Sequence, residues 1–451
     1  MELNEVKKLI QDAGVVGAGG AGFPTFAKLA EGADTLIINA AECEPLLYTD
    51  FMLIRERLYR VLEGAQAVME MANIPRCLLA VKKHNGDALH WTEGQELAPG
   101  IYAKILPNVY PMGDEINLIY EATGRLVPPG QLPLKVGVIV MNLETVYNVR
   151  AALRHNKPVI EKWLTIGGDL PKAYVVRVPV GTRVLSLFQK LGVKVPAGHT
   201  VIDGGPSMGR MIDYEKAIVT KATKGLLILP DEIPAIYTKK RTMRVQLTMA
   251  SSACCQCTRC TDMCPRNLLG YPIEPHKHVR VENAVAEAMP EDVLTATTCC
   301  SCGICEIAAC CQSISPRAVI QDHKAILGKN RMKYVAKEGD VYRVSPDRES
   351  RQMPSERWKR LLGVDKFDKT PEYIAEKIVF PWVEVFTSQH IGAPSIPCVE
   401  VGDRVTEGQV IANAAAGFSV PQHASISGTV TYVDPTKIII EQTDAQNSQK
   451  G

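Results

Sequence analysis

Cysteines at short, regular intervals are the strongest chemical signal in this sequence. Of its 14 cysteines, eleven lie between residues 254 and 311. The first run has the spacing C-x2-C-x2-C-x3-C-P, and its ligand candidates are Cys254, Cys257, Cys260 and Cys264. This spacing is typical of 4Fe-4S ferredoxins, in which three thiolates of one loop bind one cluster and the fourth cysteine binds the other cluster of a pair.

A second cysteine run predicts a second cluster. Its first three candidates are Cys299, Cys302 and Cys305, and the fourth is Cys310 or Cys311, of which we take Cys310. Zinc is the alternative for a lone Cys-x-x-Cys. Zinc sites combine two pairs of ligands, however, whereas each run here offers three evenly spaced cysteines. We therefore expect two 4Fe-4S clusters that carry single electrons.

The other cysteines are given structural roles. Cys255 and Cys300 directly follow a ligand candidate and are expected to be non-ligands, and Cys77 and Cys398 are expected to be buried apolar residues. The first eight residues, MELNEVKK, contain no apolar segment of a secretory signal. We therefore expect a reducing cytoplasm, where clustered cysteines bind metal more often than they form disulfides.

A glycine-rich loop is the second chemical signal. Gly17, Gly19, Gly20 and Gly22 lie between a predicted helix over residues 2–13 and another over residues 25–31. Backbone N–H groups of such a loop can approach a phosphate, and the positive end of the following helix would face it. Nearby, Phe23 can stack on a flat ring and Lys28 can neutralise a phosphate. An ordinary glycine turn is the alternative, because no strand precedes the loop.

Alternating strands and helices are predicted around the glycine-rich loop and would position its residues. Apolar strands are predicted over residues 35–39, 77–82 and 136–141, and helices over 50–71 and 115–123. This alternation predicts an α/β sheet covered on both faces. Glu42 and Glu44 follow the first strand, at the edge where such sheets bind ligands. The helix over residues 2–13 is expected to dock on its own domain, with recognition of a partner as the alternative.

The remaining chain divides by composition. Residues 172–229 predict a small α+β module, residues 329–378 charged helices plus a linker, and residues 383–441 short strands separated by glycines. The 451 residues carry a formal net charge of +2, so the chain lacks the large positive charge that is typical of proteins that bind nucleic acid. No apolar run approaches the ~20 residues of a membrane span.

Four motifs in order carry a resemblance to a known family. They are Gly17–Thr25, Asn39–Pro45, Tyr110–Glu115 and Val140–Thr145. The series resembles the NADH-oxidising, FMN-binding subunit of respiratory complex I and the C subunit of Rnf complexes. The resemblance implies FMN contacts at Gly17, Gly19, Gly20, Lys28, Asn39, Glu42, Asn142 and Thr145. It also implies that the nicotinamide nucleotide faces Phe23, Glu44 and Glu115. For Glu115 and Asn142, a role at a helix start is the alternative.

The resemblance implies a multidomain α/β architecture. The expected parts are a Rossmann-like FMN/NADH domain (1–165), a β-grasp (SLBB) module (170–235), a helical two-cluster ferredoxin-like domain (245–328), a charged segment (329–380), a barrel-sandwich hybrid domain (381–443) and a frayed tail (444–451). In Rnf C subunits the barrel-sandwich module precedes the flavin domain, whereas here it comes last. No lysine lies between residues 391 and 436, so this module is not an acyl carrier.

The whole chain resembles the cobalamin reductases of propanediol-utilising bacterial microcompartments. That implies an oxidoreductase that moves electrons from NADH through FMN and two clusters to cobalamin, reducing cob(III)alamin towards cob(II)alamin and cob(I)alamin. Implied partners are a cobalamin adenosyltransferase and a microcompartment shell protein, with a homo-oligomer as an option and a cytoplasmic location in or on the microcompartment. The alternatives are an Rnf-like carrier that passes electrons from NADH to ferredoxin or another acceptor, and a non-enzymatic redox relay docked to a shell. No residues mark a corrinoid pocket or acid–base catalysis.

Overall fold

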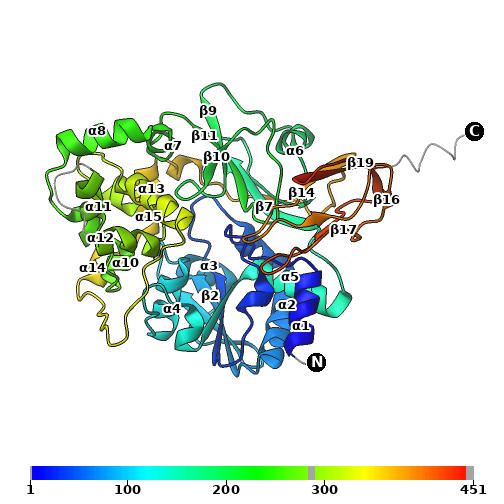
Figure 1. The fold of residues 1–451 in the computed structure, drawn as a ribbon, viewed down its shortest axis with the longest axis horizontal. Helices are drawn as coiled ribbons and strands as arrows, with labels where there is room; N and C mark the ends of the chain where they lie inside the picture. Colours follow the sequence, from blue (N-terminus) through cyan, green and yellow to red (C-terminus); the bar gives the residue numbers. More distant parts are fainter. Residues whose placement is uncertain (1–2, 283–289, 443–451) are drawn as a thin grey trace, which may run out of the picture.

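The structure is a computed structural model that describes residues 3–282 and 290–442, and Figure 1 shows how its parts are arranged. A five-stranded sheet and a six-stranded sheet form the middle of the view. The helices of the cysteine-rich region lie on the left, and the short C-terminal strands lie on the right. The tail over residues 444–451, expected to fray, lies outside the described residues.

The first sheet has the strand order β3-β4-β2-β1-β6. Its parallel strands are β1 (Thr35–Ala40), β2 (Arg76–Lys82), β4 (Ile101–Leu106) and β6 (Val138–Asn142), and β3 (Glu96–Ala98) pairs antiparallel with β4. The sequence does not predict β3 and β4, because polar residues interrupt their apolar pattern. The chain proceeds from β1 towards β4 and later places β6 on the other side of β1. The carboxyl ends of β1 and β6 therefore border the crevice in which such sheets bind ligands.

Helices cover both faces of this sheet, as the alternation predicts. One face carries α1 (Leu3–Asp12), α2 (Thr49–Met71) and α5 (Leu143–His155), which share one apolar core. On the other face, α4 (Glu115–Thr123) packs into a second core. Val6 and Ile10 of α1 are fully buried. The first helix thus packs on its own domain.

The second sheet is mixed and has the order β10-β9-β11-β7-β8-β13. Helix α6 (Val184–Leu191) packs on it through Leu187 and Phe188. The strands are β7 (Glu161–Gly168), β8 (Tyr174–Pro179), β9 (His199–Asp203), β10 (Arg210–Ile212), β11 (Gly225–Pro230) and β13 (Glu372–Tyr373).

The charged segment after residue 329 contains two short strands in addition to the predicted helices and linker. Besides α14 (Arg348–Arg351) and α15 (Ser355–Leu362), it contains β12 (Met353–Pro354), which pairs with β5 (Val109–Tyr110) beside the first sheet. Its β13 extends the second sheet by pairing with β8. These strands have two residues each, too few for a periodic pattern, so the sequence prediction was incomplete here. The segment joins both sheets to the helical region.

Short helices make up the cysteine-rich region. They are α7 (Pro234–Lys240), α8 (Met243–Ala253), α9 (Arg259–Asp262), α10 (Pro265–Leu268), α11 (Pro275–Glu282), α12 (Pro290–Leu294) and α13 (Pro316–Lys329). A π-helical turn over Cys305–Ala309 carries part of the second cysteine run. None of the helices in residues 3–282 and 290–442 combines the length and apolar character needed to cross a membrane.

Two small sheets form the C-terminal domain. Their strands are β14 (Trp382–Phe386), β15 (Ile396–Pro397), β16 (Arg404–Val405), β17 (Val410–Asn413), β18 (Gln422–His423), β19 (Gly428–Val433) and β20 (Lys437–Glu441). The domain touches the first domain through Phe418, whose ring lies 6.0 Å from that of Phe23. Cys77 is buried as expected, but Cys398 is exposed, which corrects its assignment. Cys398 lies in a short connection at the edge of a thin sheet, where the core does not cover it.

Candidate flavin and iron–sulfur sites

The glycine-rich loop is open towards solvent. Gly17 N–H donates to Phe23 O at 2.8 Å and closes the base of the loop, while Gly19 and Gly20 are exposed. Gly20 has φ +106°, and apart from its two chain neighbours no described residue has an atom within 4 Å of the position that a Cβ would take there. The predicted helix over 25–31 is wrong, because Thr25–Lys28 is a single 3-10 turn. The backbone of the loop itself, rather than a helix end, therefore offers the N–H groups that suit a phosphate.

Several predicted residues meet at the carboxyl ends of β1 and β6. Asn39 and Asn142 are register partners at these ends. A Cβ on Gly19 would lie 3.5 Å from Nδ2 of Asn142. Lys28 Nζ donates to Val140 O at 3.1 Å and pairs with Glu115 at 3.0 Å. The open glycines, one ammonium and side-chain amides thus fit a phosphorylated cofactor with a polar ring, and this is the donor set expected for FMN.

The helix-start alternative also has support. Asn142 Oδ1 accepts from Glu144 N at 3.1 Å and caps α5. Glu115 is the first residue of α4, where Asp114 is the cap. Asn39 stabilises a loop, since its Nδ2 donates to Gly113 O at 2.9 Å. The two asparagines therefore hold backbone as well as bordering the crevice.

Glu42 and Glu44, which follow β1, both accept hydrogen bonds from other parts of the chain. Glu42 accepts from the N–H groups of Asp50 (2.8 Å) and Phe51 (3.1 Å) at the start of α2. Burial raises the pKa of Glu42 to about 7, Asp50 adds to the rise, and Lys224 opposes it. Glu44 accepts from Ser207 N at 2.8 Å, which joins the first domain to the loop after β9. Burial raises the pKa of Glu44.

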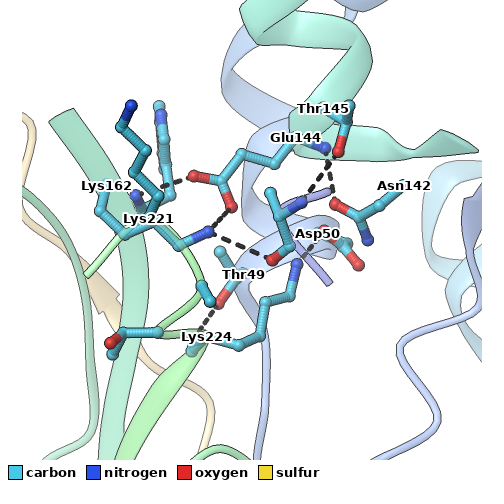
Figure 2. Close-up of polar contacts among 12 residues, drawn as sticks. Thr49, Asp50, Asn142, Glu144, Thr145, Lys162, Lys221 and Lys224 are labelled. Carbon is cyan, nitrogen blue, oxygen red and sulfur yellow. Dashed lines mark hydrogen bonds and ion pairs between the residues drawn. The ribbon is translucent and has the colours of Figure 1, made fainter. Parts of the chain in front are cut away.

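A buried ion pair fixes the glycine-rich loop from behind, and Figure 2 shows it. Lys162 of β7 pairs with Glu144 of α5, and each side chain is only 1% exposed. Lys162 Nζ also donates to Ala18 O at 3.2 Å, while Ala18 N donates to Thr145 Oγ1 at 3.0 Å. Both polar backbone atoms of Ala18 are therefore held by side chains. The hydroxyl of Thr145, predicted as an FMN contact, orients the loop.

A second buried pair lies beside the first. Lys224 pairs with Asp50 at the start of α2 (Figure 2). Thr49 Oγ1 lies 2.9 Å from Thr165 Oγ1 of β7. Sequence reasoning missed these residues because charged side chains usually mark surface positions. The available signal is Lys162 itself, which directly precedes the apolar residues Trp163 and Leu164 of β7.

A separate cavity of about 80 Å³ lies at the carboxyl ends of β1 and β2. Glu42, Cys43, Glu44 and Lys82 line it. Lys82 is 2% exposed, and its Nζ donates to Ser355 Oγ at 3.3 Å. Burial lowers the pKa of Lys82. The cavity is smaller than the roughly 150 Å³ that accommodates a benzene molecule, so it does not compete with the open loop as a cofactor site.

The two cysteine runs exchange their fourth members. Burial raises the pKa of Cys305 well above its usual range, and Glu306, Cys299 and Cys264 raise it further. Cys264, the last cysteine of the first run, packs in the same apolar cluster as Cys299 of the second run. We call this group the inner set; its members are Cys264, Cys299, Cys302 and Cys305.

The outer set is formed in the reciprocal way. Burial raises the pKa of Cys260 to about 12, and among nearby thiols Cys310 contributes most, followed by Cys257 and Cys254. Cys254 and Cys310 also pack against the same apolar cluster. The outer set is Cys254, Cys257, Cys260 and Cys310. Each set offers four thiols, which fits a 4Fe-4S cluster.

The two sets differ in exposure. In the inner set Cys264, Cys302 and Cys305 are each at most 8% exposed. In the outer set Cys257 is exposed, and its neighbours Cys255 and Cys311 are exposed too.

One aromatic pair connects the inner set to the first domain. Tyr110 Oη donates to Cys302 O at 2.7 Å and lies 3.2 Å from Glu44 Oε1. Its ring stacks on Trp358 of α15 at 4.7 Å between centroids. Trp358 Nε1 in turn donates to Ser207 Oγ at 2.9 Å. The first sheet, the second sheet and the inner set therefore meet in one packed junction.

Three family models match the chain in order. The Nuo51 FMN-binding domain matches residues 10–151, the 4Fe-4S dicluster domain residues 253–315, and the RnfC barrel sandwich hybrid domain residues 369–447. They confirm the predicted multidomain class, with a flavin-binding α/β domain, an iron–sulfur domain and a C-terminal barrel-sandwich domain.

Similar proteins are known over almost the full length. Cobalamin reductase PduS of Salmonella typhimurium is 36% identical over 441 residues, which cover 98% of this chain and 97% of that protein. The PduS protein of Citrobacter freundii is also 36% identical and covers 96% of both chains. The C subunit of the Na+-translocating ferredoxin:NAD+ oxidoreductase complex of Acetobacterium woodii is 32% identical over 276 residues, 59% of each chain.

Proposed function

The chain belongs to the family of the cobalamin reductase PduS, and we propose that it transfers electrons from NADH through FMN and two 4Fe-4S clusters to cobalamin. FMN accepts the two electrons of a hydride together and releases them singly, and iron–sulfur clusters carry them one at a time. The observation that carries the proposal is the order of sites along the molecule. The open glycine-rich loop borders the first sheet, the buried inner set adjoins that domain through Tyr110, and the exposed outer set comes last.

The first domain supplies the flavin site in this proposal. Backbone groups of Gly17, Gly19 and Gly20 bind the phosphate with Lys28, and Asn39, Glu42 and Asn142 border the ring. Thr145 acts through Ala18, because its hydroxyl already accepts from that N–H. The nicotinamide nucleotide faces Phe23 and Glu115. Glu44 acts on this side by positioning, since Ser207 and Tyr110 occupy its carboxylate.

The inner and outer sets have different duties. The inner set receives electrons from the flavin side, because Cys302 is joined to Tyr110 of the flavin-binding domain. The outer set delivers them, since Cys257 reaches the surface. An acceptor at the surface needs no ligand from the protein. Cobalamin is that acceptor in our proposal, taken from cob(III)alamin to cob(II)alamin or cob(I)alamin.

The biological setting follows from the family. We propose that the reduced cobalamin passes to a cobalamin adenosyltransferase, which recycles coenzyme B12 for propanediol utilisation. The protein would work in or on a bacterial microcompartment and contact a shell protein, and a homo-oligomer is compatible with this. These partners rest on the family alone.

One alternative has its own observation. The Rnf-type subunit of Acetobacterium woodii shares 32% identity over 276 residues, which favours an NADH-linked carrier for a ferredoxin-like acceptor. The two functions differ only in what meets the outer set, so the choice of acceptor separates them.

The test is an anaerobic reduction with the reconstituted protein. NADH is added, and the spectra of flavin, clusters and hydroxocobalamin are followed together. Flavin bleaching followed by cob(II)alamin is the expected result. The variant Glu115→Gln should lose the NADH step, whereas Glu215→Gln, an exposed glutamate of the second sheet's loops, should not. Reduced flavin and clusters with unchanged cobalamin would reject cobalamin as the acceptor and favour the ferredoxin-like one.

A further inference from the structure

Two surplus cysteines lie side by side at the surface. Cys255 and Cys311 belong to neither the inner nor the outer set, and both are exposed. Their Sγ atoms and that of Cys257 all lie within 4.8 Å of one another. Exposed free thiols are uncommon on intracellular surfaces because they react, so two in contact call for a function.

The two thiols come from different segments. Cys255 lies in the connection between α8 and α9, and Cys311 follows the π-helical turn Cys305–Ala309. These same segments supply the outer set, since Cys254 and Cys257 flank Cys255 and Cys310 precedes Cys311. A covalent link between the surplus pair would therefore hold together the two pieces of chain that enclose the outer cluster.

Cys257 does not compete for this link when the outer cluster is bound. Its thiolate is then an iron ligand, which leaves Cys255 and Cys311 as the free pair. A disulfide needs an S–S distance near 2.05 Å. Both residues lie in exposed irregular segments, and their thiols are already in each other's reach. A side-chain rotation with a small loop adjustment would form the bond.

We propose that Cys255 and Cys311 form a reversible disulfide that closes over the outer cluster under oxidising conditions. The inference rests on the outer-set assignment of the proposed function. The oxidant is a low-molecular-weight disulfide. The thiolate of one cysteine attacks it and forms a mixed disulfide, releasing one small thiol. The second cysteine displaces the other small thiol. Two S–H bonds of the protein are lost, one S–S bond forms, and the external disulfide takes up both electrons and both protons.

The bond would protect the outer cluster rather than conduct electrons. Iron leaves an oxidised cluster more easily when the ligand-bearing loops can separate, and the disulfide would tie these loops directly. Reduction by cellular thiols would reopen the site, as is usual for redox-sensing disulfides in the cytoplasm. Such a disulfide is available only to the outer set. The inner set is buried and has no exposed partner cysteines among the described residues.

The experiment uses the holoprotein with both clusters and FMN. Samples are equilibrated anaerobically with oxidised and reduced glutathione at several ratios, free thiols are alkylated, and peptides are identified by mass spectrometry. A Cys255–Cys311 cross-link that disappears on reduction is expected. On later exposure to air, the oxidised wild type should lose outer-cluster iron several-fold more slowly than Cys255→Ser or Cys311→Ser. Cys398→Ser, which removes an exposed thiol of the C-terminal domain, should behave like the wild type.

Two outcomes overturn the inference, and they are distinguishable. Separate alkylation of Cys255 and Cys311 at the most oxidising ratio, with full iron content, would reject the disulfide while leaving the clusters in place. A loss of iron in Cys255→Ser or Cys311→Ser before any oxidation would instead make that residue a ligand. In that case the outer-set assignment would fail, together with the part of the proposed function that depends on it.

Discussion

The inner and outer cysteine sets each contain four cysteines but have opposite surroundings. The inner set is buried and joined to the flavin-binding domain by Tyr110 and Trp358. The outer set opens to solvent, and its nearest neighbours are two surplus thiols. Buried polar contacts accumulate on the inner side, where three domains meet and geometry must be fixed. The outer end has few such contacts, which suits exchange with a separate acceptor.

The largest expected difference is between Cys302→Ser and Cys257→Ser. Each should remove one cluster and about half of the iron. Cys302→Ser should also lower the melting temperature strongly, because its cluster lies in the junction between domains. Cys257→Ser should leave the melting temperature close to that of Cys398→Ser, the control. Equal destabilisation by both ligand variants, measured by calorimetry with iron analysis, would break the comparison.

The next effect tests the buried pair behind the glycine-rich loop. Lys162→Met leaves the Glu144 carboxylate buried without its cation, which should cost about 3–5 kcal/mol of stability. It also removes the donor to Ala18 O. A loss of about 1–1.5 kcal/mol in loop positioning corresponds to roughly tenfold weaker FMN binding.

A double variant separates these two roles. Lys162→Met with Glu144→Leu replaces the ion pair by apolar side chains and should recover much of the stability. FMN affinity, measured by flavin fluorescence, should stay weak because Ala18 O still lacks its donor. Recovery of both properties together would show that the pair serves stability alone.

A smaller effect concerns the junction with the C-terminal domain. Lys221 is buried, and its acceptors are Gly14 O (3.0 Å) and Pro421 O (3.2 Å). Burial lowers the pKa of Lys221 to about 7. His390 and His423 face it, and burial, reinforced by Lys221, lowers their pKa values, so both are neutral above pH 7. The folded chain thus binds one proton fewer here than the unfolded chain above pH 7.

The sign of the pH dependence follows from this proton count. The contribution of Lys221 to stability is fully present above its unfolded pKa near 10.5 and is lost as the pH falls towards 7. Relative to Lys221→Met, the wild type should gain about 1.4 kcal/mol per pH unit between pH 7 and 9. Parallel melting curves for both proteins across this range would contradict the lowered pKa.

The smallest effect is expected at the bridging hydroxyl. Tyr110→Phe keeps the stacking on Trp358 but removes the donor to Cys302 O, which should cost about 1 kcal/mol. The inner cluster should still assemble, and its reduction after NADH addition should slow. Tyr237→Phe, at an exposed tyrosine of α7, provides the control. A wild-type reduction rate in Tyr110→Phe would mean that the hydroxyl only supports packing.

The sequence predicts the parts of this protein better than their connections. The spacing of the cysteines identified both runs, because three ligands of each cluster lie within a few residues of one another. The apolar strands β1, β2 and β6 were also predicted. Lys162, Glu144 and Lys224 were not, since a charge that is paired only after domains dock has no local pattern. The same holds for β12 and β13, whose two residues pair across domains. The helix expected over residues 25–31 is shorter than predicted, because Leu29 is extended (φ −77°, ψ 117°) directly after the Thr25–Lys28 turn.

The order of electron flow is the central claim, and rapid freeze-quenching after mixing with NADH tests it most directly. In Cys257→Ser, the inner cluster should become reduced at the wild-type rate while added hydroxocobalamin remains oxidised. In Cys302→Ser, the flavin should be reduced while the outer cluster stays oxidised. Reduction of the outer cluster at the wild-type rate in Cys302→Ser would contradict the account, because electrons would then reach the surface without passing the inner set.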